Sequence, residues 1–509
     1  MQKKAIPVVD LFAGPGGLGE GFSSVEDASG NPIFDLRVSI EKDPVAHQTL
    51  ALRALFRKFP KHRAPDCYYD YIRGNLSREE LRSNQQIASE LQQALQEARC
   101  ATLGETPRLE IDSWIGEAIG ESDPWVLIGG PPCQAYSVIG RSRRRGMDLK
   151  HIEEDKRHFL YREYLRIIRK FHPTVFVMEN VKGILSSTHD GSLIFERILK
   201  DLSKPGRDLE YEIRSFVIPH GGDHPEPKDF IIEAERFGVP QMRHRVILFG
   251  VRRDHQSRKH RQLQPASNQV SVLQALSGLP ELRSRLSREP DSFNAWLNVL
   301  EMGPKALAGW KNTDARKVIK QEMLDAGIRA RAHFSTGGQF VRGSGRTDTS
   351  MSTKLRAWYY DARLGGATNH ETRFHMRSDI HRYLFASCHA RAFGISPKLG
   401  QFPPELLPNH GNVNDEDAPF EDRFRVQMGR NPSSTVVSHI AKDGHYFIHP
   451  DPSQARSLTV REVARLQTFP DNYFFEGNRT NQYVQVGNAV PPYLAHQIAV
   501  SAPVSKRMA

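Results

Sequence analysis

Short apolar runs alternate with longer polar stretches through the first half of the chain. The runs read "IPVVDLF", "RVSIEKD", "PWVLIGG", "TVFVMEN" and "RVILFGV", and most are rich in Val, Ile and Phe. Continuous apolar runs of this length are typical of strands buried on both faces, as in a parallel sheet with helices between its strands. The pattern therefore predicts an α/β fold with a doubly wound, mostly parallel sheet.

The stretch 77–103 has a helical period instead. It is polar apart from apolar residues at helical intervals, namely Leu81, Ile87, Leu91, Leu95 and Ala98. This spacing predicts a surface helix inserted between two strands.

The character of the chain changes after Arg252 and again near residue 433. "RRDHQSRKHRQLQPASNQ" has no clear period, and the segment up to about residue 430 combines a predicted helix at 315–331 with glycine-rich pieces. Strand-like runs return with "STVVSHI" and "HYFIHP", and a helical "TVREVARLQTF" follows them. We place domain boundaries at 252/253 and 432/433. The pattern does not predict the fold of 253–432.

The positive charge of the chain is confined to one segment. The sequence holds 70 Lys and Arg against 59 Asp and Glu, a net charge of +11, and residues 253–400 alone hold 24 basic and 12 acidic residues. Such a segment indicates either a surface for a polyanion or a well-solvated face. No apolar run approaches the roughly 20 residues that span a bilayer. The four cysteines form no CxxC pair, so we expect a soluble protein of the reducing cytoplasm.

A glycine-rich loop follows the first apolar run. "VVDLFAGPGGLGEGF" contains G-x-G-x-x-G at residues 14–19, which is compatible with a nicotinamide dinucleotide. Phe12 offers an aromatic wall to a flat or cationic group such as a sulfonium. Glu41 ends the next strand-like run, where an acid can accept hydrogen bonds from ribose hydroxyls. The loop therefore predicts a nucleotide-like ligand and leaves its identity open.

A cysteine follows two prolines at the end of another apolar run, in "GGPPCQAYS". Pro131 and Pro132 restrict the backbone before Cys133, so its sulfur starts from few conformations. A thiol in such a place is either structural or, as a thiolate, a nucleophile. Glu179 and Asn180 follow a further apolar run in the same manner. Because carboxyl ends of parallel strands share one edge, we expect Cys133, Glu179 and the glycine loop to converge.

A thiolate, an acid and a cationic cofactor together suit methylation of cytosine. Addition of the thiolate at carbon 6, with an acid at ring N3, makes carbon 5 nucleophilic enough to accept a methyl group. A base inside a duplex must be flipped out of its stack to react in this way.

Six motifs in this order resemble those of DNA (cytosine-5)-methyltransferases: "DLFAGPGGLGEGF", "GGPPCQAYS", "MENVKG", "RFGVPQMRHRVILFGVR", "RSLTVREVARLQTFPDNY" and "QVGNAVPP". The resemblance implies that Cys133 is the attacking thiolate and Glu179 the acid at N3. It implies that Asn180 orders the pocket, that Arg243 and Arg245 belong to the active centre, and that Arg245 meets the cytosine carbonyl oxygen.

The same resemblance implies S-adenosyl-L-methionine as the cofactor. Asn75 in "YIRGNLS" stands nearest to the position where the family usually has an Asp that meets the adenine amino group; an Asn carbonyl can accept the same hydrogen bond. The implied cofactor residues are Asp10, Phe12, Ala13, Gly14, Gly16, Gly17, Leu18, Glu41, Asn75, Pro131, Asn488 and Val490.

The resemblance also implies contacts with duplex DNA. Gln134 and Ser137 begin the loop that closes over DNA in the family, and its basic "IGRSRRRG" suits phosphates. In the family the stretch after the QxRxR motif is the target-recognition region, which here coincides with the basic segment. The candidate DNA contacts are Gln134, Ser137, Arg141, Arg143, Arg342, Arg346, Arg373 and Arg377.

The resemblance assigns roles to the three segments. Residues 1–252 correspond to the catalytic domain that binds S-adenosylmethionine, 253–432 to the target-recognition domain, and 433–509 to a return segment that completes both. We expect a monomeric, site-specific DNA methyltransferase that makes 5-methylcytosine in a restriction-modification or defence system, with a separate cognate restriction or defence component. The alternatives are an RNA cytosine-5 methyltransferase, a DNA-binding protein with a dead site, and a dehydrogenase.

Overall fold

The chain divides into two compact units. The first comprises residues 1–64, 82–268 and 489–509, and the second comprises 65–81 and 269–488. The boundaries expected at 252/253 and 432/433 differ from these divisions, because 433–488 belongs to the same unit as most of 253–432. The computed structural model describes residues 4–60, 63–131, 157–189, 192–219, 225–255, 260–332, 334–343, 348–408 and 422–502.

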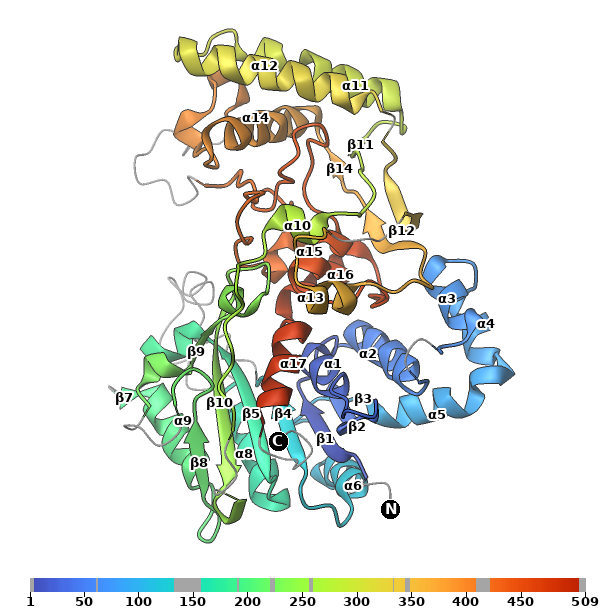
Figure 1. Cartoon of the computed structure of the whole chain (residues 1–509), viewed down its shortest axis with the longest axis vertical. Helices are drawn as coiled ribbons and strands as arrows, with labels where there is room; N and C mark the ends of the chain where they lie inside the picture. The colour runs from blue at the N-terminus through green and yellow to red at the C-terminus, as the bar shows by residue number, and fades with distance from the viewer. Residues whose placement is uncertain are drawn as a thin grey trace. The chain divides into compact units, whose positions relative to one another are not determined.

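Among the described residues, an eight-stranded sheet forms the centre of the first unit (Figure 1). Its order is β3-β2-β1-β4-β5-β10-β8, and β9 pairs with β10. The pairs from β3 to β5 are parallel, whereas β10 is antiparallel to β5, β8 and β9. The strands are β1 (Ile6–Leu11), β2 (Phe34–Glu41), β3 (Ala98–Cys100), β4 (Val126–Gly129), β5 (Val175–Val181), β8 (Tyr211–Arg214), β9 (Ile231–Glu233) and β10 (His244–Arg252).

All five apolar runs form strands of this sheet, and the predicted α/β fold with a mostly parallel sheet is confirmed. The last run forms β10, which lies antiparallel beside β5, and the pattern did not indicate this direction. An apolar run reports burial on both faces, and burial is the same for either direction of the strand.

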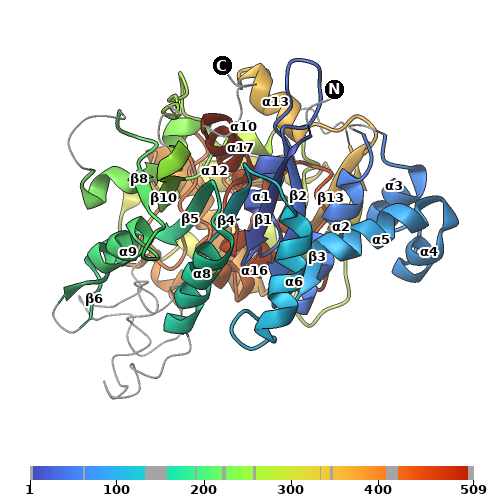
Figure 2. The ribbon, with the colours of Figure 1, turned by 90° about the horizontal axis from the view of Figure 1, so that it is seen from below.

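Helices cover both faces of the sheet. Neighbouring residues of β1 separate the two layers: Val9 belongs to a core with residues of α6 and α8, and Val8 to a core with residues of α1 and α17. Figure 2 shows α6 and α8 on one side and α17 on the other. The helices of this unit are α1 (Gly17–Ser23), α2 (Pro44–Arg57), α5 (Ala88–Glu97), α6 (Arg108–Ile119), α8 (Arg157–Phe171), α9 (Ile194–Ser203) and α17 (Pro492–Ser501), and β6 (Thr188–His189) and β7 (Ser192–Leu193) form a small hairpin.

The single helix predicted over 77–103 is wrong. The stretch contains α4 (Arg78–Ser83), a short 3₁₀ helix, α5 and the edge strand β3. Leu95 of α5 is 44% exposed, whereas Glu97 is buried and accepts from Lys58 at 2.6 Å and from Arg57. Ion pairing lets a charged side chain occupy the buried face, which a count of apolar spacings does not detect.

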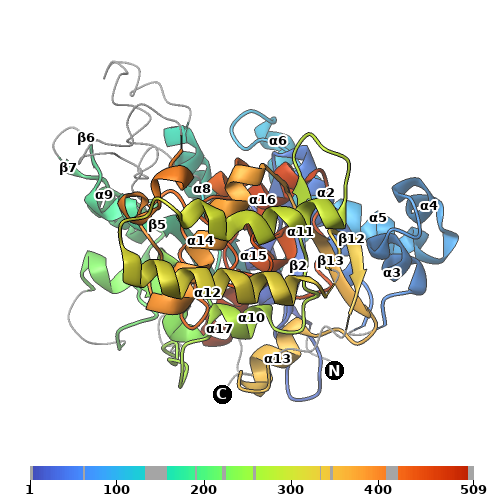
Figure 3. The same cartoon turned by 90° about the horizontal axis from the view of Figure 1, so that it is seen from above.

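The second unit contains a helical layer and two small sheets. α11 (Phe293–Met302), α12 (Thr313–Ala330) and α14 (Arg377–Phe393) pack around Trp296 and Tyr383 (Figure 3). α12 confirms the helix predicted at 315–331, and no described helix of either unit is long and apolar enough to cross a membrane. One sheet is the antiparallel pair of β12 (Gly337–Arg342) and β13 (Gly366–Glu371), and the other is the parallel pair of β11 (Arg285–Leu286) and β14 (Phe374–His375). The other described α-helices of this unit are α3 (Asp66–Arg73), α10 (Val272–Leu276), α13 (Thr353–Tyr359), α15 (Val460–Leu466) and α16 (Arg479–Asn488).

The strands expected in "STVVSHI" and "HYFIHP" are wrong, although most of their apolar residues are buried. Val436, Ile440 and Ile448 are buried in irregular backbone and a 3₁₀ helix (Ser438–Ala441), and Ile448 forms isolated bridges only. The helix predicted in "TVREVARLQTF" is confirmed as α15. Burial in an irregular segment gives the same apolar signature as burial in a strand.

Candidate active site

The loop between β1 and α1 is shaped by its backbone. Phe12, Gly14 and Gly16 have positive φ angles of 59°, 58° and 98°, a conformation that glycine adopts readily and phenylalanine does not. A Cβ on Gly17 would lie 2.3 Å from the carbonyl oxygen of Val490, so the last segment of the chain packs directly on the loop. A Cβ on Gly14 would meet nothing within 4 Å, which leaves room for a ligand beside the loop.

Glu41 at the end of β2 faces this loop. Its carboxylate accepts a hydrogen bond from the Gly14 N–H at 2.8 Å and one from the Asp43 N–H at 2.8 Å. A carboxylate offers about four acceptor positions, so acceptor capacity remains for two neighbouring hydroxyl groups. The acid, the aromatic Phe12 and the open side of Gly14 together fit a nucleoside with a cationic substituent.

Three other predicted cofactor residues, Ala13, Leu18 and Asp10, support the loop from the buried side. Ala13 donates its N–H to the Ile40 carbonyl at 3.0 Å, and Leu18 is buried in the core shared with α17. Asp10 is fully buried, and burial raises the pKa of its carboxyl to about 8, opposed by Arg57 and the Gly19 N–H. These positions favour support of the loop over direct contact with a ligand.

Glu179 and Arg245 form an ion pair between neighbouring strands. Glu179 lies on β5 and Arg245 on β10, and the Arg245 Nε and a Glu179 carboxylate oxygen are 2.9 Å apart. A Cβ on Gly130 would lie 2.9 Å from the other carboxylate oxygen, and the Asn180 amide donates to the Pro131 carbonyl at 3.5 Å. Gly130 and Pro131 therefore lie against Glu179 and Asn180. The expected approach of Cys133 concerns a residue outside the described ones.

Two arginines, one buried and one largely buried, accompany this acid. Arg243 and Arg245 lie two residues apart, and burial lowers the pKa of both guanidinium groups, whereas the Glu179 carboxylate opposes this shift for both. The site thus combines one carboxylate with two guanidinium groups. Such a set can donate hydrogen bonds to a carbonyl oxygen that gains negative charge.

Two predicted cofactor residues belong to the second unit. Asn488 is the exposed last residue of α16. Asn75 donates its side-chain amide to Asp70 at 3.3 Å and precedes β3 by more than twenty residues. The strand beside Glu41 is β3, where Glu41 pairs with Cys100. Asn75 therefore lies before the helices that precede this strand, and its contact with the adenine amino group stays a prediction.

Cys100 and the following Ala101 are positions that the sequence reasoning missed. The Ala101 N–H donates to the Glu41 carbonyl at 3.0 Å, so this strand end lies next to the loop acid. The only sequence signal for this strand end is the short "ARCA" within the polar stretch 77–103. Four residues are too few to show a period.

The predicted DNA contacts have different environments. Arg342 is exposed at the end of β12, and Arg377 is exposed in an ion pair of 2.6 Å with Glu289. Arg373 is buried: it donates to the carbonyls of Ile440, Ala441 and Lys442. Its guanidinium is used within the fold, so we withdraw Arg373 as a DNA contact. Cys133, Gln134, Ser137, Arg141, Arg143 and Arg346 lie outside the described residues.

Comparison with known proteins gives a consistent result. The chain is 29% identical over 513 residues to the type II methyltransferase M.Bpa9945I of Bacillus paralicheniformis, covering 97% of each chain. It is 26% identical over 424 residues to the DNA (cytosine-5-)-methyltransferase M.ApeKI of Aeropyrum pernix, covering 74% of this chain and 80% of the relative. A solved structure assigned to a prophage-encoded DNA modification methyltransferase of E. coli has the same fold, with a TM-score of 0.54 at 18% identity over 97% of each chain. The profile described as C-5 cytosine-specific DNA methylase matches residues 72–502, and the chain therefore belongs to this family.

Proposed function

We propose that this enzyme transfers a methyl group from S-adenosyl-L-methionine to carbon 5 of a cytosine flipped out of duplex DNA, through a covalent adduct with Cys133. The observation that carries the proposal is the Glu179–Arg245 pair at the root of the "GGPPC" segment, in the same unit as the glycine loop. Family membership supports the reaction class.

The chemistry assigns one step to each group. The Cys133 thiolate adds to cytosine carbon 6, while Glu179 donates a hydrogen bond or proton to N3 and Arg245 donates to the O2 carbonyl oxygen. Carbon 5 then takes the methyl group, which leaves the donor as a neutral thioether. Water removes the hydrogen on carbon 5 as a proton, N3 returns its proton to Glu179, and expulsion of the thiolate restores the aromatic ring and the Cys133 nucleophile.

The first unit supplies the residues that would hold the cofactor, which brings an activated methyl group on a sulfonium. Phe12 offers its ring to the cationic centre, and Glu41 retains acceptor capacity for the ribose hydroxyls. Gly14 leaves open space beside the loop because it has no side chain, and the Val490 carbonyl packs against Gly17.

The biological setting follows from the relatives. M.Bpa9945I is named a type II methyltransferase and covers nearly the whole chain, which supports a role in a restriction-modification system with a separate cognate endonuclease. A monomer with a cytoplasmic location suits such an enzyme. We infer duplex DNA rather than RNA as the substrate, because M.ApeKI is named a DNA (cytosine-5-)-methyltransferase. A competition assay between duplex DNA and tRNA distinguishes the two.

Trapping with 5-fluorocytosine tests the covalent step. Fluorine at carbon 5 cannot leave as a proton does, so the adduct persists after methyl transfer. We expect a complex with fluorinated duplex DNA that withstands denaturation and requires the methyl donor. Cys133→Ser should form no complex and should still bind S-adenosylmethionine, because the thiol makes no contact with the glycine loop in the proposed mechanism. A wild-type enzyme that methylates cytosine yet is never trapped would refute the covalent route.

A further inference from the structure

A short segment of the second unit holds some side chains buried and others exposed. Glu371 ends β13 and Phe374 begins β14. In this 371–377 segment the side chain of Glu371 is 41% exposed, and Phe374 and Met376 are 48% and 54% exposed. Thr372, Arg373 and His375 are buried.

The buried residues anchor the segment to the rest of the unit. The Thr372 hydroxyl donates to the Arg283 carbonyl at 2.9 Å, and the His375 ring accepts from the Ser457 N–H at 3.3 Å. Arg373 donates to backbone carbonyls, and its guanidinium lies 4.2 Å above the Tyr483 ring. Recognition residues are most precise on backbone held in this way.

The outward side chains form a charged and aromatic group with Arg285. Arg285 pairs with Phe374 in the β11–β14 register, and its guanidinium lies 5.5 Å from the centre of the Phe374 ring. The same guanidinium lies 3.9 Å from the Glu371 carboxylate. Arg285 thus offsets the charge of Glu371, which would otherwise repel a polyanion.

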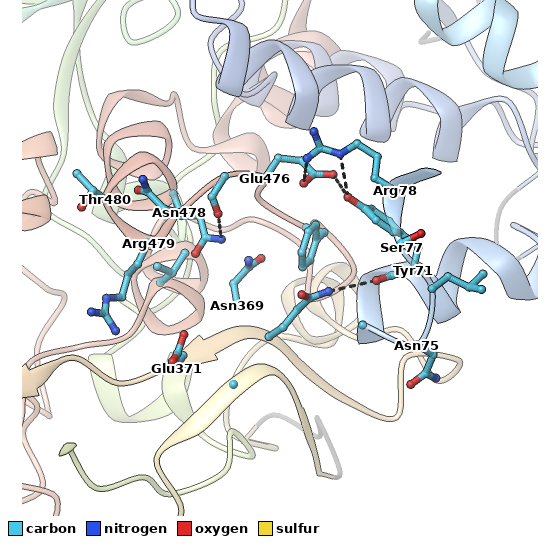
Figure 4. Close-up of a pocket in the computed structure, with 18 of the residues that line it drawn as sticks. Tyr71, Asn75, Ser77, Arg78, Asn369, Glu371, Glu476, Asn478, Arg479 and Thr480 are labelled. Carbon is cyan, nitrogen blue, oxygen red and sulfur yellow. Dashed lines mark hydrogen bonds and ion pairs between the residues drawn. The ribbon is translucent and has the colours of Figure 1, made fainter. Parts of the chain in front are cut away.

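Glu371 and Phe374 also line a pocket of about 1040 Å³ within the second unit (Figure 4). Arg479, Asn478 and Thr480 lie together on one side, across from Tyr71 and Arg78. Its charged lining consists of two arginines and three glutamates, and Arg78 pairs with Glu476 at 2.6 Å. Phosphate binding requires excess cations, whereas base edges are read by amides, carboxylates and apolar groups. The lining amides are Asn75, Gln339, Asn369, Asn478 and Gln482.

We propose that the 371–377 segment reads base edges of the DNA target, with Glu371 and Phe374 as specificity-determining residues. Glu371 accepts a hydrogen bond from the N4 amino group of a cytosine in the major groove, and the Phe374 ring contacts the neighbouring base. The exposed Arg342 and Arg377 are placed at phosphates. The inference rests on the proposed function, because it requires DNA as the substrate.

The test compares methylation patterns of surface variants. Wild type, Glu371→Gln and Phe374→Ala are expressed in a host without cytosine methylation, and bisulfite sequencing defines the methylated sequence. Phe393→Ala is the matched control, because Phe393 is 43% exposed in the same unit and does not line the pocket. We expect each pocket variant to lose discrimination at one position by about 5- to 150-fold, whereas the control keeps the wild-type sequence.

The possible results distinguish a failure of the proposed function from a failure of the base-reading role alone. If the wild-type protein leaves no 5-methylcytosine, the proposed function fails. If it methylates a defined sequence and both variants methylate the same sequence with unchanged preference, only the reading role is overturned. A variant without product in cells is purified and tested on duplexes altered at single positions. A folded variant that weakens equally on all of them also overturns the reading role.

Discussion

The buried carboxyl of Asp10 leads to a prediction with a definite sign. Asp10 is fully buried at the end of β1, and neither carboxylate oxygen accepts a well-aligned hydrogen bond from any residue that the structure describes. Burial raises its pKa from 3.8 to about 8. The folded protein therefore holds this proton more tightly than the unfolded chain does.

The sign and size of the effect follow from proton linkage. Below pH 3.8 the carboxyl is neutral in both states and costs no stability through ionisation. As the pH rises, the unfolded chain releases the proton first, so the first unit loses about 1.4 kcal/mol per pH unit until the folded group also ionises. The loss amounts to about 2 kcal/mol at pH 5 and to at most about 5 kcal/mol at pH 8.

Asp10→Asn removes the ionisation and keeps the shape of the side chain. We expect the variant to be more stable than the wild type, by a small margin at pH 5 and by several kcal/mol at pH 8. Because two units need not unfold together, the measurement is hydrogen exchange of the β1 amides, corrected for intrinsic exchange at each pH. We also expect the affinity for S-adenosylmethionine to be retained, since Asp10 lies beneath the loop.

Glu20→Gln is the matched control with the opposite sign. Glu20 is also buried, but it accepts from Arg53 Nε at 2.9 Å, and its pKa is lowered by Arg53 and Arg57 in spite of burial. The substitution leaves a buried guanidinium without its carboxylate, which typically costs about 3–5 kcal/mol. A less stable Asp10→Asn variant at pH 8, or a stability difference that does not change between pH 5 and 8, would refute the reasoning.

Three further predictions concern other parts of the chain. Gly17→Ala should destabilise the first unit by about 1–3 kcal/mol and weaken cofactor binding, because its Cβ would lie 2.3 Å from the Val490 carbonyl; calorimetric titration with S-adenosylmethionine checks this, and unchanged affinity would contradict it. Asp471→Asn should destabilise the second unit by about 3–5 kcal/mol, because Asp471 accepts two bonds of 2.8 Å from the fully buried Arg465; limited proteolysis of wild type and variant measures the loss. Affinity for duplex DNA should fall steeply with added salt, as the basic segment requires; a flat response in fluorescence anisotropy would exclude it as the docking surface.

The pattern of apolar runs predicts much of the secondary structure of the first unit. A strand buried on both faces needs a continuous apolar run, so all five central runs appear in the sequence. The chemistry-bearing residues directly follow these runs, as Phe12 and Gly14 follow β1 and Glu41 ends β2. Because parallel strands bring such ends to one edge, the approach of Gly130 and Pro131 to Glu179 and Asn180 was predictable without coordinates.

The sequence pattern did not predict features that depend on contacts between residues far apart in the chain. The direction of β10, the division of 77–103 and the inward turn of Arg373 depend on neighbours far along the chain. From the sequence alone Arg373 is expected to be an exposed cation, whereas in the folded chain it donates to three backbone carbonyls of another segment. The sequence by itself therefore determined the reaction class and the strand ends that carry it. The tertiary structure decided which charged side chains remain exposed, because burial of a charge depends on pairing, and pairing is a property of the folded chain.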